Sequence, residues 1–375
     1  MDYTTQNLGF RLKKVLRYCS LYGLDRTLSK VRGQYHMKKS YTQLPKMDEC
    51  KPHSGHVGLI GCGNYAFSNI AYYLNKNHKG AIRAAMDIDI NKAASMFQHY
   101  QLAYYTADAD KLINDPHIDL LYIASNHASH AEYAIKALEQ GKHVHIEKPH
   151  VVSLSQLERL VASAESSQGK IVSVGYNRPE SRFGEKIKHS LHSQQGAGMY
   201  NWFVAGHELD PDHWYFKQQE GGRVLGNLCH WTDFTYKMVP AEHRYPITIK
   251  PVRSDKSDCD IAVNYTFGDG SIAVITFSAK GHTFEGVREK FAAHRGNALI
   301  SMDDFQTLTI EIVDQKTKIR TFTRDHGHQN SILSSYQRAQ AGQGLAHEYI
   351  WQTAELFLKT KQALENDQVL VIDAA

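Results

Sequence analysis

The sequence lacks the features of a membrane-spanning, disulfide-linked or zinc-ribbon protein. No apolar stretch approaches the roughly 20 residues that cross a bilayer, and no charged-then-apolar signal segment opens the chain. Cysteine is scarce and odd in number, and no two of the five lie two residues apart: Cys19, Cys50, Cys62, Cys229 and Cys259. This scarcity argues against a disulfide framework and predicts a protein of the reducing cytoplasm.

The chain also lacks a strong charge of either sign. Its net charge of +4 is too small to predict nucleic-acid binding. The 22 histidines are scattered, without HExxH spacing or a cysteine partner, so no metal site is predicted. What remains is an ordinary globular composition, 42% hydrophobic and 22% charged, in 375 residues, which is enough for two domains.

The first 55 residues differ from the rest because bases far outnumber acids there. Residues 8–39 carry nine lysines and arginines against one acid, Asp25. Apolar residues recur at helical spacing, which predicts a basic amphipathic helix: Leu8, Leu12, Val15, Leu16 and Cys19. We expect this apolar stripe to pack on the protein body or on a partner subunit; a weak contact with an anionic membrane surface is the alternative. Residues 51–55 predict a linker. We expect the first 50 residues to be dispensable for the fold but to matter for assembly or location.

From residue 56 onward, short apolar strands alternate with helices. Residues 57–60 predict a strand, and "GCGNYA" (61–66) follows it as a GxGxxA turn that opens a helix. Its glycines permit a tight turn and the close approach of a pyrophosphate, while the small last residue lets helix and strand pack closely. The next predicted strand (81–86) ends at Asp87, which has the spacing of the acid that binds an adenosine ribose. Because Ile88 follows and offers nothing to a 2′-phosphate, NAD is favoured over NADP.

Two further predicted strands, residues 120–124 and 144–146, flank a predicted helix at 129–139. In an open parallel sheet, ligands bind beyond the carboxyl ends of the strands. "SNHASH" (125–130) and "EKP" (147–149) fall at these ends, so we expect both segments to face a cofactor crevice. The residues assigned to NAD are Gly61, Gly63, Asn64, Tyr65, Asp87, Asn126, His127, His130, Glu147 and Lys148.

Four motifs in order resemble those of a known family. They are "HAEYAIKALEQGKHVHIEKP" (130–149), "VGYNR" (174–178), "EGGRVLGNLCHWTD" (220–233) and "FGDGSIAVITFSAKG" (267–281). Through them the chain from residue 56 to its end is similar to the Gfo/Idh/MocA oxidoreductases, which include glucose–fructose oxidoreductase and inositol dehydrogenase. The resemblance implies an α/β protein with a Rossmann NAD-binding domain at 56–176. It further implies an α+β domain at 177–375 with a large, mostly antiparallel open sheet, whose open face builds homo-oligomers.

The second domain shows its own strand patterns. Apolar or alternating runs predict strands at 199–204, 261–267, 272–278, 308–313 and 319–322. The last predicted helix, roughly 347–364, is expected to return to the core.

Hydride transfer from a secondary alcohol needs a base for the hydroxyl proton and a cation beside the developing alkoxide. The resemblance implies that Lys148 is the cation and His230 the proton relay. Many family members place an aspartate four residues before this histidine, where the present chain has Gly226 followed by Asn227. Asp233, one turn after the histidine, stands in for it if its side chain turns inward; the alternative is a solvated helix residue.

Aromatic and arginine side chains near the second-domain motifs suit a sugar ring attached to an anionic group. The residues assigned to substrate are Tyr176, Asn177, Arg178, Trp214, Arg223, Asn227 and Asp233. They favour a nucleotide-linked sugar of the kind used in surface-glycan biosynthesis, with free inositol or a hexose as the alternative. A different class also stays open, because the missing aspartate suits a regulator that binds NAD and sugar without catalysis.

Overall fold

The computed structural model describes residues 5–48, 53–167, 169–253, 260–281 and 283–374. Part of the predicted linker (51–52) and two of the cysteines, Cys50 and Cys259, lie outside these ranges. The chain divides into two compact units. The small-sheet unit contains residues 24–175 and 328–351, and the large-sheet unit contains residues 1–23, 176–327 and 352–375.

As far as its residues are described, the small-sheet unit is built on six parallel strands in the order β3-β2-β1-β4-β5-β6. The strands are β1 (Val57–Ile60), β2 (Ile82–Met86), β3 (Tyr104–Thr106), β4 (Leu120–Ile123), β5 (His143–Ile146) and β6 (Val172–Val174). The helices are α2 (Leu24–His36), η2 (Ala66–Ala71), α3 (Tyr72–Asn77), α4 (Ile90–Tyr100), α5 (Ala109–Ile113), α6 (His127–Glu139), α7 (Leu154–Ser166) and α10 (His328–Ala341). The strand order reverses between β1 and β4, as in a Rossmann fold, which confirms the predicted class of this unit.

Burial explains why these short runs form strands. All four residues of β1 and of β4 are buried, as in a parallel sheet covered by helices on both faces. Phe67 of η2 and Ile332 of α10 belong to the same apolar core, and the Tyr122 hydroxyl donates to the Ile332 carbonyl at 2.7 Å. These contacts explain why residues 328–351, which the sequence placed in the second domain, belong to the small-sheet unit.

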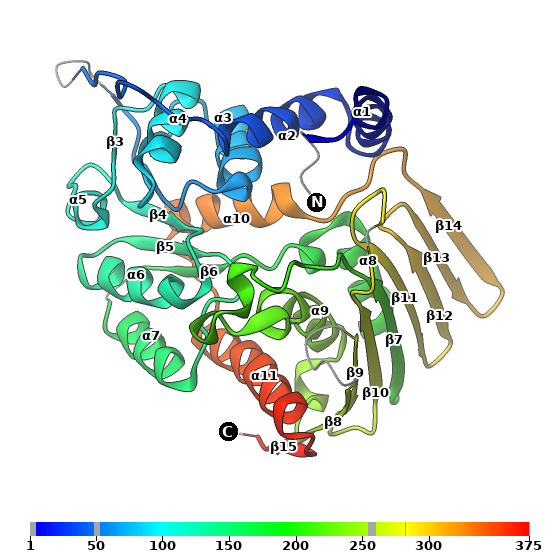
Figure 1. Cartoon of the computed structure of the whole chain (residues 1–375). Helices are drawn as coiled ribbons and strands as arrows, with labels where there is room; N and C mark the ends of the chain where they lie inside the picture. The colour runs from blue at the N-terminus through cyan, green and yellow to red at the C-terminus, as the bar shows by residue number, and fades with distance from the viewer. Residues whose placement is uncertain (1–4, 49–52, 168, 254–259, 282, 375) are drawn as a thin grey trace. The chain divides into compact units, whose positions relative to one another are not determined.

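In its described residues, the large-sheet unit has nine strands in the order β14-β13-β12-β11-β7-β10-β9-β8-β15 (Figure 1). Its pairs are antiparallel except β7 with β10, which confirms the predicted large, mostly antiparallel sheet. The strands are β7 (Gly198–Ala205), β8 (Ile247–Arg253), β9 (Asp260–Thr266), β10 (Ile272–Ser278), β11 (Arg288–Arg295), β12 (Ala298–Asp303), β13 (Thr307–Ile312), β14 (Gln315–Arg320) and β15 (Leu370–Ile372). The strand predicted to reach Phe322 ends before it, and that side chain is 98% exposed.

Helices and short turns complete the large-sheet unit. They are α1 (Leu8–Tyr22), η3 (Arg178–Glu180), α8 (Arg182–His192), η4 (Trp214–Phe216), η5 (Gln218–Glu220), η6 (Val224–Leu228), α9 (Cys229–Met238), η7 (Ala241–His243) and most of α11 (His347–Asn366). Alternating burial along β7 shows that one face of the sheet packs against apolar side chains while the other is open.

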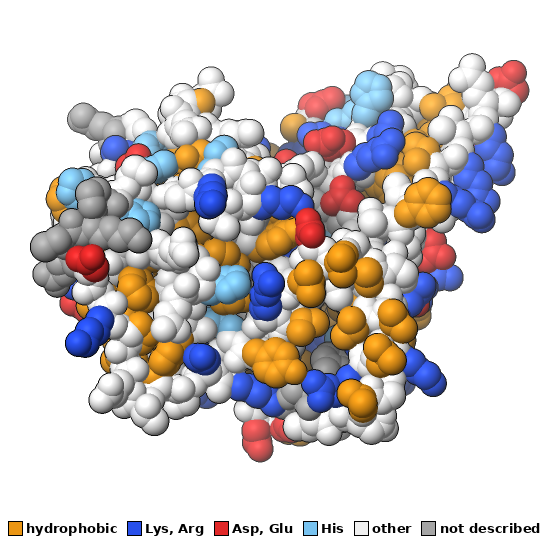
Figure 2. All heavy atoms as spheres, turned by 90° about the horizontal axis from the view of Figure 1, so that it is seen from above, with side chains coloured by type: hydrophobic (Ala, Val, Ile, Leu, Met, Phe, Trp, Pro, Cys, Tyr) orange, Lys and Arg blue, Asp and Glu red, His pale blue; other side chains and the backbone are white. Residues whose placement is uncertain are grey.

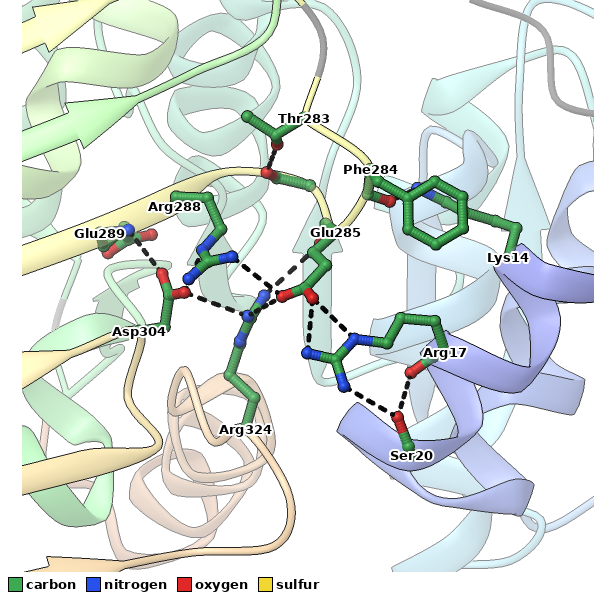
Figure 3. Close-up of polar contacts among 11 residues, drawn as sticks. Lys14, Arg17, Ser20, Thr283, Phe284, Glu285, Arg288, Glu289, Asp304 and Arg324 are labelled. Atoms are coloured by element: carbon green, nitrogen blue, oxygen red, sulfur yellow. Dashed lines mark hydrogen bonds and ion pairs between the residues drawn. The ribbon is translucent and has the colours of Figure 1, made fainter. Parts of the chain in front are cut away.

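The basic N-terminal helix forms as predicted, but its orientation differs from the expectation. α1 is held by its polar face: Arg17 pairs with Glu285 at 2.5 Å, and Lys14 donates to the Phe284 carbonyl (Figure 3). Glu285 also binds Arg324 at 3.1 Å, which ties the helix to a buried charge network. The apolar stripe points outward instead of packing on this unit, and the exposed fractions are 78% for Leu8, 58% for Leu12 and 63% for Leu16.

A second N-terminal helix, α2, was not predicted. Gly23 ends α1 with φ +82°, and α2 then belongs to the small-sheet unit. Its His36 side chain is 3% exposed and Thr27 is 2% exposed. Removing α2 would therefore uncover buried surface, so the expectation that the whole extension is dispensable does not fit its packing. No helix among the described residues is long and apolar enough to cross a bilayer.

A buried ion pair stabilises the start of the large-sheet unit. The Arg178 guanidinium binds Glu289 through two contacts, 2.9 Å and 2.5 Å long, and stacks over the Trp231 ring. The Trp231 indole also donates to Glu289 at 3.2 Å. Removing one member of such a pair leaves the other charge buried without compensation.

We therefore expect Glu289→Gln to lower the free energy of unfolding by about 3–5 kcal/mol, measured by denaturant unfolding. The matched control is Glu365→Gln, which breaks the exposed α11 pair with Lys361 and should cost less than about 0.5 kcal/mol. Equal unfolding midpoints for the two variants would contradict a stabilising role for the buried pair.

Candidate functional site

The glycine turn after β1 has the geometry that the GxGxxA pattern predicts. Gly61 has φ +90°, and a Cβ there would lie 2.5 Å from the Ala124 carbonyl oxygen at the end of β4. Only glycine fits this position, because the turn passes directly over the neighbouring strand. Gly63 shows the opposite environment, since a Cβ there meets nothing within 4 Å. The open space beside Gly63 is what the approach of a pyrophosphate to the backbone requires.

Asp87 stands at the end of β2 beside the same turn. Its Oδ2 accepts a hydrogen bond from the Cys62 N–H at 2.7 Å, and its Oδ1 accepts one from the Asp89 N–H at 2.9 Å. Each carboxylate oxygen has a second lone pair for the hydroxyl of a ribose. Ile88, the next residue, is 85% exposed and apolar. The carboxylate thus holds the glycine turn and keeps acceptor capacity for a nucleoside.

The predicted loops after β4 and β5 are joined from within by a buried histidine. His130 places one ring nitrogen 2.8 Å from the Pro149 carbonyl and the other 3.1 Å from the Ser125 carbonyl, and burial lowers its pKa. His127 is also buried, at 3% exposure. Asn126 is exposed at the start of α6, where its side chain accepts from the Ser129 hydroxyl at 2.7 Å. Of these three predicted residues, Asn126 is therefore the one exposed at the strand ends.

The "EKP" segment begins with a buried carboxylate. Glu147 is 5% exposed, its Oε1 lies 3.3 Å from the His145 Nε2, and a Cβ on Gly175 would lie 2.7 Å from that oxygen. Burial, then the charge of Glu147, raise the pKa of the Tyr65 phenol well above its usual value. Lys148 is half-buried directly after the strand, and its peptide bond to Pro149 is cis. Glu147 is thus part of a buried polar group, whereas Lys148 reaches the surface.

The sequence did not single out His145 or its partner on α10. The ring bonds the Ser335 hydroxyl at 2.8 Å as well as Glu147, and all of it is buried. Alternation along β5 could have indicated an inward histidine, but its partner on α10 lies 190 residues away in the chain. Only the tertiary structure identifies this support of the "EKP" segment.

The large-sheet unit places His230 beside a buried polar cluster. His230 is half-buried at the start of α9, and its ring lies 6.3 Å from the Tyr176 ring, edge to face. Asp233 is fully buried and accepts a hydrogen bond from the Thr353 hydroxyl at 3.1 Å. Burial, then Cys229 and Asp233, raise the pKa of the Tyr176 phenol well above its usual value. The alternative of a solvated Asp233 is therefore wrong.

Two of the other residues assigned to substrate are arginines, and both are buried against protein groups. Arg178 and Arg223 are buried, at 8% and 3% exposure. The first pairs with Glu289, and the second donates to the His207 carbonyl and stacks over Phe277. Both guanidinium groups therefore have protein partners of their own.

Two asparagines and a tryptophan complete the assigned set. Asn177 is buried and donates to the His326 carbonyl at 2.7 Å. Trp214 and Asn227 are partly exposed, in η4 and in the π-helical turn η6, respectively. Trp214 and Asn227 are therefore more accessible than Asn177.

A comparison with known families tests the prediction of a Rossmann NAD-binding domain in the small-sheet unit. Residues 56–176 match the model of an oxidoreductase family with an NAD-binding Rossmann fold, GFO_IDH_MocA. Residues 56–176 therefore form the NAD-binding Rossmann domain of the Gfo/Idh/MocA oxidoreductases. This confirms the resemblance drawn from the motifs, and NAD is the cofactor of this family's Rossmann domain.

Individual relatives and solved structures agree with the assignment. The oxidoreductase YrbE of Bacillus subtilis is 25% identical over 262 residues, which cover 68% of this chain and 76% of that protein. The inositol 2-dehydrogenase of Ralstonia nicotianae is 32% identical over 124 residues, or 33% and 37% of the two chains. A levoglucosan dehydrogenase in complex with NADH and levoglucosan has a TM-score of 0.73 at 15% identity, covering 85% of this chain and 99% of that one. At that identity the likeness shows the fold, including the large sheet.

The residues of this Gfo/Idh/MocA Rossmann domain fit NAD. The open space at Gly63 and the spare lone pairs of Asp87 suit its pyrophosphate and adenosine ribose, respectively. Among the residues that the structure describes, no group of three or more histidines, cysteines or acids is arranged to hold a metal ion.

We expect Asp87→Ala to weaken NAD binding by about 1–3 kcal/mol, because it removes a charged acceptor from the ribose and from the Cys62 N–H. Titration calorimetry of NAD and NADP measures both affinities. Asp110→Ala removes an exposed carboxylate elsewhere in the same unit and should leave NAD affinity unchanged. Unchanged NAD affinity in the Asp87 variant, with tight NADP binding, would refute the ribose assignment.

Proposed function

We propose that the protein is an NAD-dependent dehydrogenase that oxidises a ring hydroxyl of a sugar or cyclic polyol, or reduces the corresponding ketone. The observation that carries this proposal is the position of Lys148. It lies two residues past the end of β5, at the carboxyl edge of the sheet whose β1 turn fits NAD. Ligands of such sheets bind at that edge, so an ammonium group there can stabilise negative charge on a substrate beside the bound cofactor.

Bound NAD would supply the acceptor for the hydride of the substrate carbon. The Lys148 ammonium neutralises negative charge on the substrate oxygen as its proton leaves. Half-burial strengthens this interaction, because less water screens the charge. Pro149 and the buried Glu147 hold the backbone on either side of the lysine, the latter through its contact with His145.

His230 serves as the proton acceptor in this proposal. A histidine needs an orienting partner, and Gly226 cannot supply the carboxylate found there in many relatives. Asp233, one turn later on α9, is the candidate replacement, since its carboxylate is buried and bonded by Thr353. Tyr176 packs edge to face on the His230 ring and helps to fix its orientation.

An uncharged ring fits the substrate residues better than a nucleotide-linked sugar. The nucleotide proposal rested on arginines, and Arg178 and Arg223 already bind protein groups. Trp214 and Asn227, which are partly exposed, offer an aromatic face and an amide to hydroxyl groups. The names of relatives also support a ring polyol, since they include inositol 2-dehydrogenase and levoglucosan dehydrogenase. A panel of inositols, hexoses and nucleotide sugars, followed by NADH absorbance near 340 nm, separates the two substrate classes.

The main prediction concerns the two proposed catalytic residues. Lys148→Met should retain NAD binding but lower kcat by about 10²–10³-fold, because a transition-state charge partner is lost. His230→Ala should cost a similar factor, and the double variant should not multiply the two losses if both serve one proton relay. Lys148→Arg should fail to restore turnover fully, since the planar guanidinium places its charge and donors differently from the compact ammonium group.

His117→Ala, which changes an exposed histidine of the small-sheet unit, is the control and should keep full turnover. Full turnover in Lys148→Met would contradict the proposed role of Lys148 in stabilising the substrate oxygen. NAD binding without turnover of any panel member would instead favour a non-catalytic NAD- and sugar-binding regulator, to which Gly226 also points.

Two exposed apolar surfaces support proposals about partners. The open face of the large sheet exposes Met199 and Phe203 of β7 and Leu299 of β12 by 62%, 52% and 52%, and we assign it to a second copy of this chain. The outward stripe of α1, with Leu12 and Leu16, is assigned to a weak contact with an anionic membrane surface. Figure 2 views the molecule from the side on which α1 lies in Figure 1, and shows hydrophobic side chains gathered near lysines and arginines.

Sedimentation experiments test the second-copy assignment of the sheet face and the membrane assignment of the α1 stripe separately. Phe203→Glu should convert an oligomer into monomers, because a charge would be buried at the interface. Leu12→Gln should leave the oligomer intact but reduce co-sedimentation with vesicles that contain anionic lipid. A wild-type monomer at all concentrations would contradict the first assignment, and unchanged vesicle binding the second.

A further inference from the structure

Helix α2 lies along the helix that follows the glycine turn, which is continuous over residues 64–77. The Arg26 guanidinium binds the Ser68 carbonyl and the Asn69 side chain, and the Ser29 hydroxyl donates to the same carbonyl at 3.2 Å. One turn further on, a Cβ on Gly33 would lie 3.2 Å from the Ser68 Cβ. The two helices are therefore packed closely at that glycine, where a Cβ would be tighter than an ordinary van der Waals contact.

The carboxyl end of α2 reaches the glycine turn itself. The His36 Nε2 bonds the Cys62 carbonyl at 2.7 Å, and its Nδ1 lies 2.9 Å from the Ser95 hydroxyl. Its ring stacks on Phe67 with 4.2 Å between the centroids. α2 is thus attached to the helix and to the turn that together bind the cofactor.

Between these contacts, Lys30 directs its amine to the start of the same helix. The Nζ lies 3.2 Å from the Asn64 Oδ1, one residue beyond Gly63. Burial, then the neighbouring charge of Arg26, lower the pKa of Lys30 to about 8. Among the residues that the structure describes, no carboxylate lies within ion-pair distance of this amine. Burying a cation beside another cation is unfavourable unless an anion compensates for it.

The cofactor offers an anion that would compensate for the charge of Lys30. In a GxGxxA turn the dinucleotide pyrophosphate lies against the N-terminus of the following helix, which here begins at Asn64. We propose that Lys30 binds the pyrophosphate of NAD, so that the N-terminal extension supplies part of the cofactor site. This inference rests on the assignment of NAD to the small-sheet unit. It adds a ligand from outside the 56–176 segment that matches the family model.

Such a contact gives α2 a role beyond packing. The ammonium adds a full charge to the partial positive charge of the helix N-terminus, and a half-buried site screens that attraction only weakly. Arg26, His36 and Gly33 then act as positioning residues, because they fix the helix that carries Lys30.

Titration calorimetry with NAD and with ADP-ribose tests the proposal, since ADP-ribose keeps the pyrophosphate and lacks the nicotinamide. Lys30→Gln should weaken both ligands by the same factor, roughly tenfold, as expected for a lost charged hydrogen bond. Lys30→Arg should retain most of the affinity. Lys79→Gln removes a charge from an exposed turn of the same unit and should change neither affinity.

The pH dependence gives a second, independent measurement. A pyrophosphate binds the protonated amine, so wild-type affinity should fall as pH rises from 7 to 9.5, through the free-state pKa of Lys30. Both Lys30 variants should lose this fall, since neither side chain titrates there. Neighbouring groups keep their charge in this range: burial lowers the pKa of His36 and raises those of Cys62 and Tyr65, and Arg26 stays cationic.

The outcomes are distinguishable from those of the proposed function. A folded Lys30→Gln protein that binds NAD and ADP-ribose as tightly as wild type would overturn the inference while leaving NAD binding established. Weakened NAD but unchanged ADP-ribose would overturn it as well, because the contact would then lie at the nicotinamide half. A wild-type protein that binds neither ligand would refute the cofactor assignment itself.

Discussion

The close passage of the β1 turn over the end of β4 is the constraint on which the cofactor site depends. At Gly61 the backbone is left-handed and a Cβ would collide with the Ala124 carbonyl. The turn is held there by the Asp87 carboxylate, which accepts the Cys62 N–H. One acid therefore fixes the turn and keeps lone pairs for the cofactor. These contacts place the start of the 64–77 helix at the strand-order reversal, where Rossmann sheets bind dinucleotides.

Around this turn, buried polar groups position side chains that remain accessible. His130 joins the loops after β4 and β5, and His145 with Ser335 holds Glu147 beneath Lys148. In the large-sheet unit, Asp233 of α9 is likewise buried and accepts a hydrogen bond from the Thr353 hydroxyl. Burying a polar group destabilises the folded state unless the group has hydrogen-bond partners. Where the partners are present, the hydrogen bonds favour one arrangement of the loops that they join.

The N-terminal extension is two helices with separate attachments. α1 is attached through Arg17 to the Glu285 network (Figure 3). α2 is attached through Arg26 to the 64–77 helix and through His36 to the glycine turn. Gly23 ends the first helix with a positive φ, so the chain changes direction there. Basic residues that appear as one run in the sequence therefore face different surroundings, and Lys30 is distinguished from its neighbours by its place beside Asn64.

The sequence alone determined the Rossmann topology and the cofactor class, because period-2 and period-3.6 patterns, glycine spacing and the acid after β2 are local signals. It also predicted the large sheet through a family resemblance. Tertiary structure decided the rest. The burial of Arg178 and Arg223 depends on Glu289 and Phe277, and the inward turn of Asp233 depends on Thr353, 120 residues away. The outward stripe of α1 and the buried face of α2 were likewise beyond prediction, since helical periodicity defines an apolar face but not the surface that covers it.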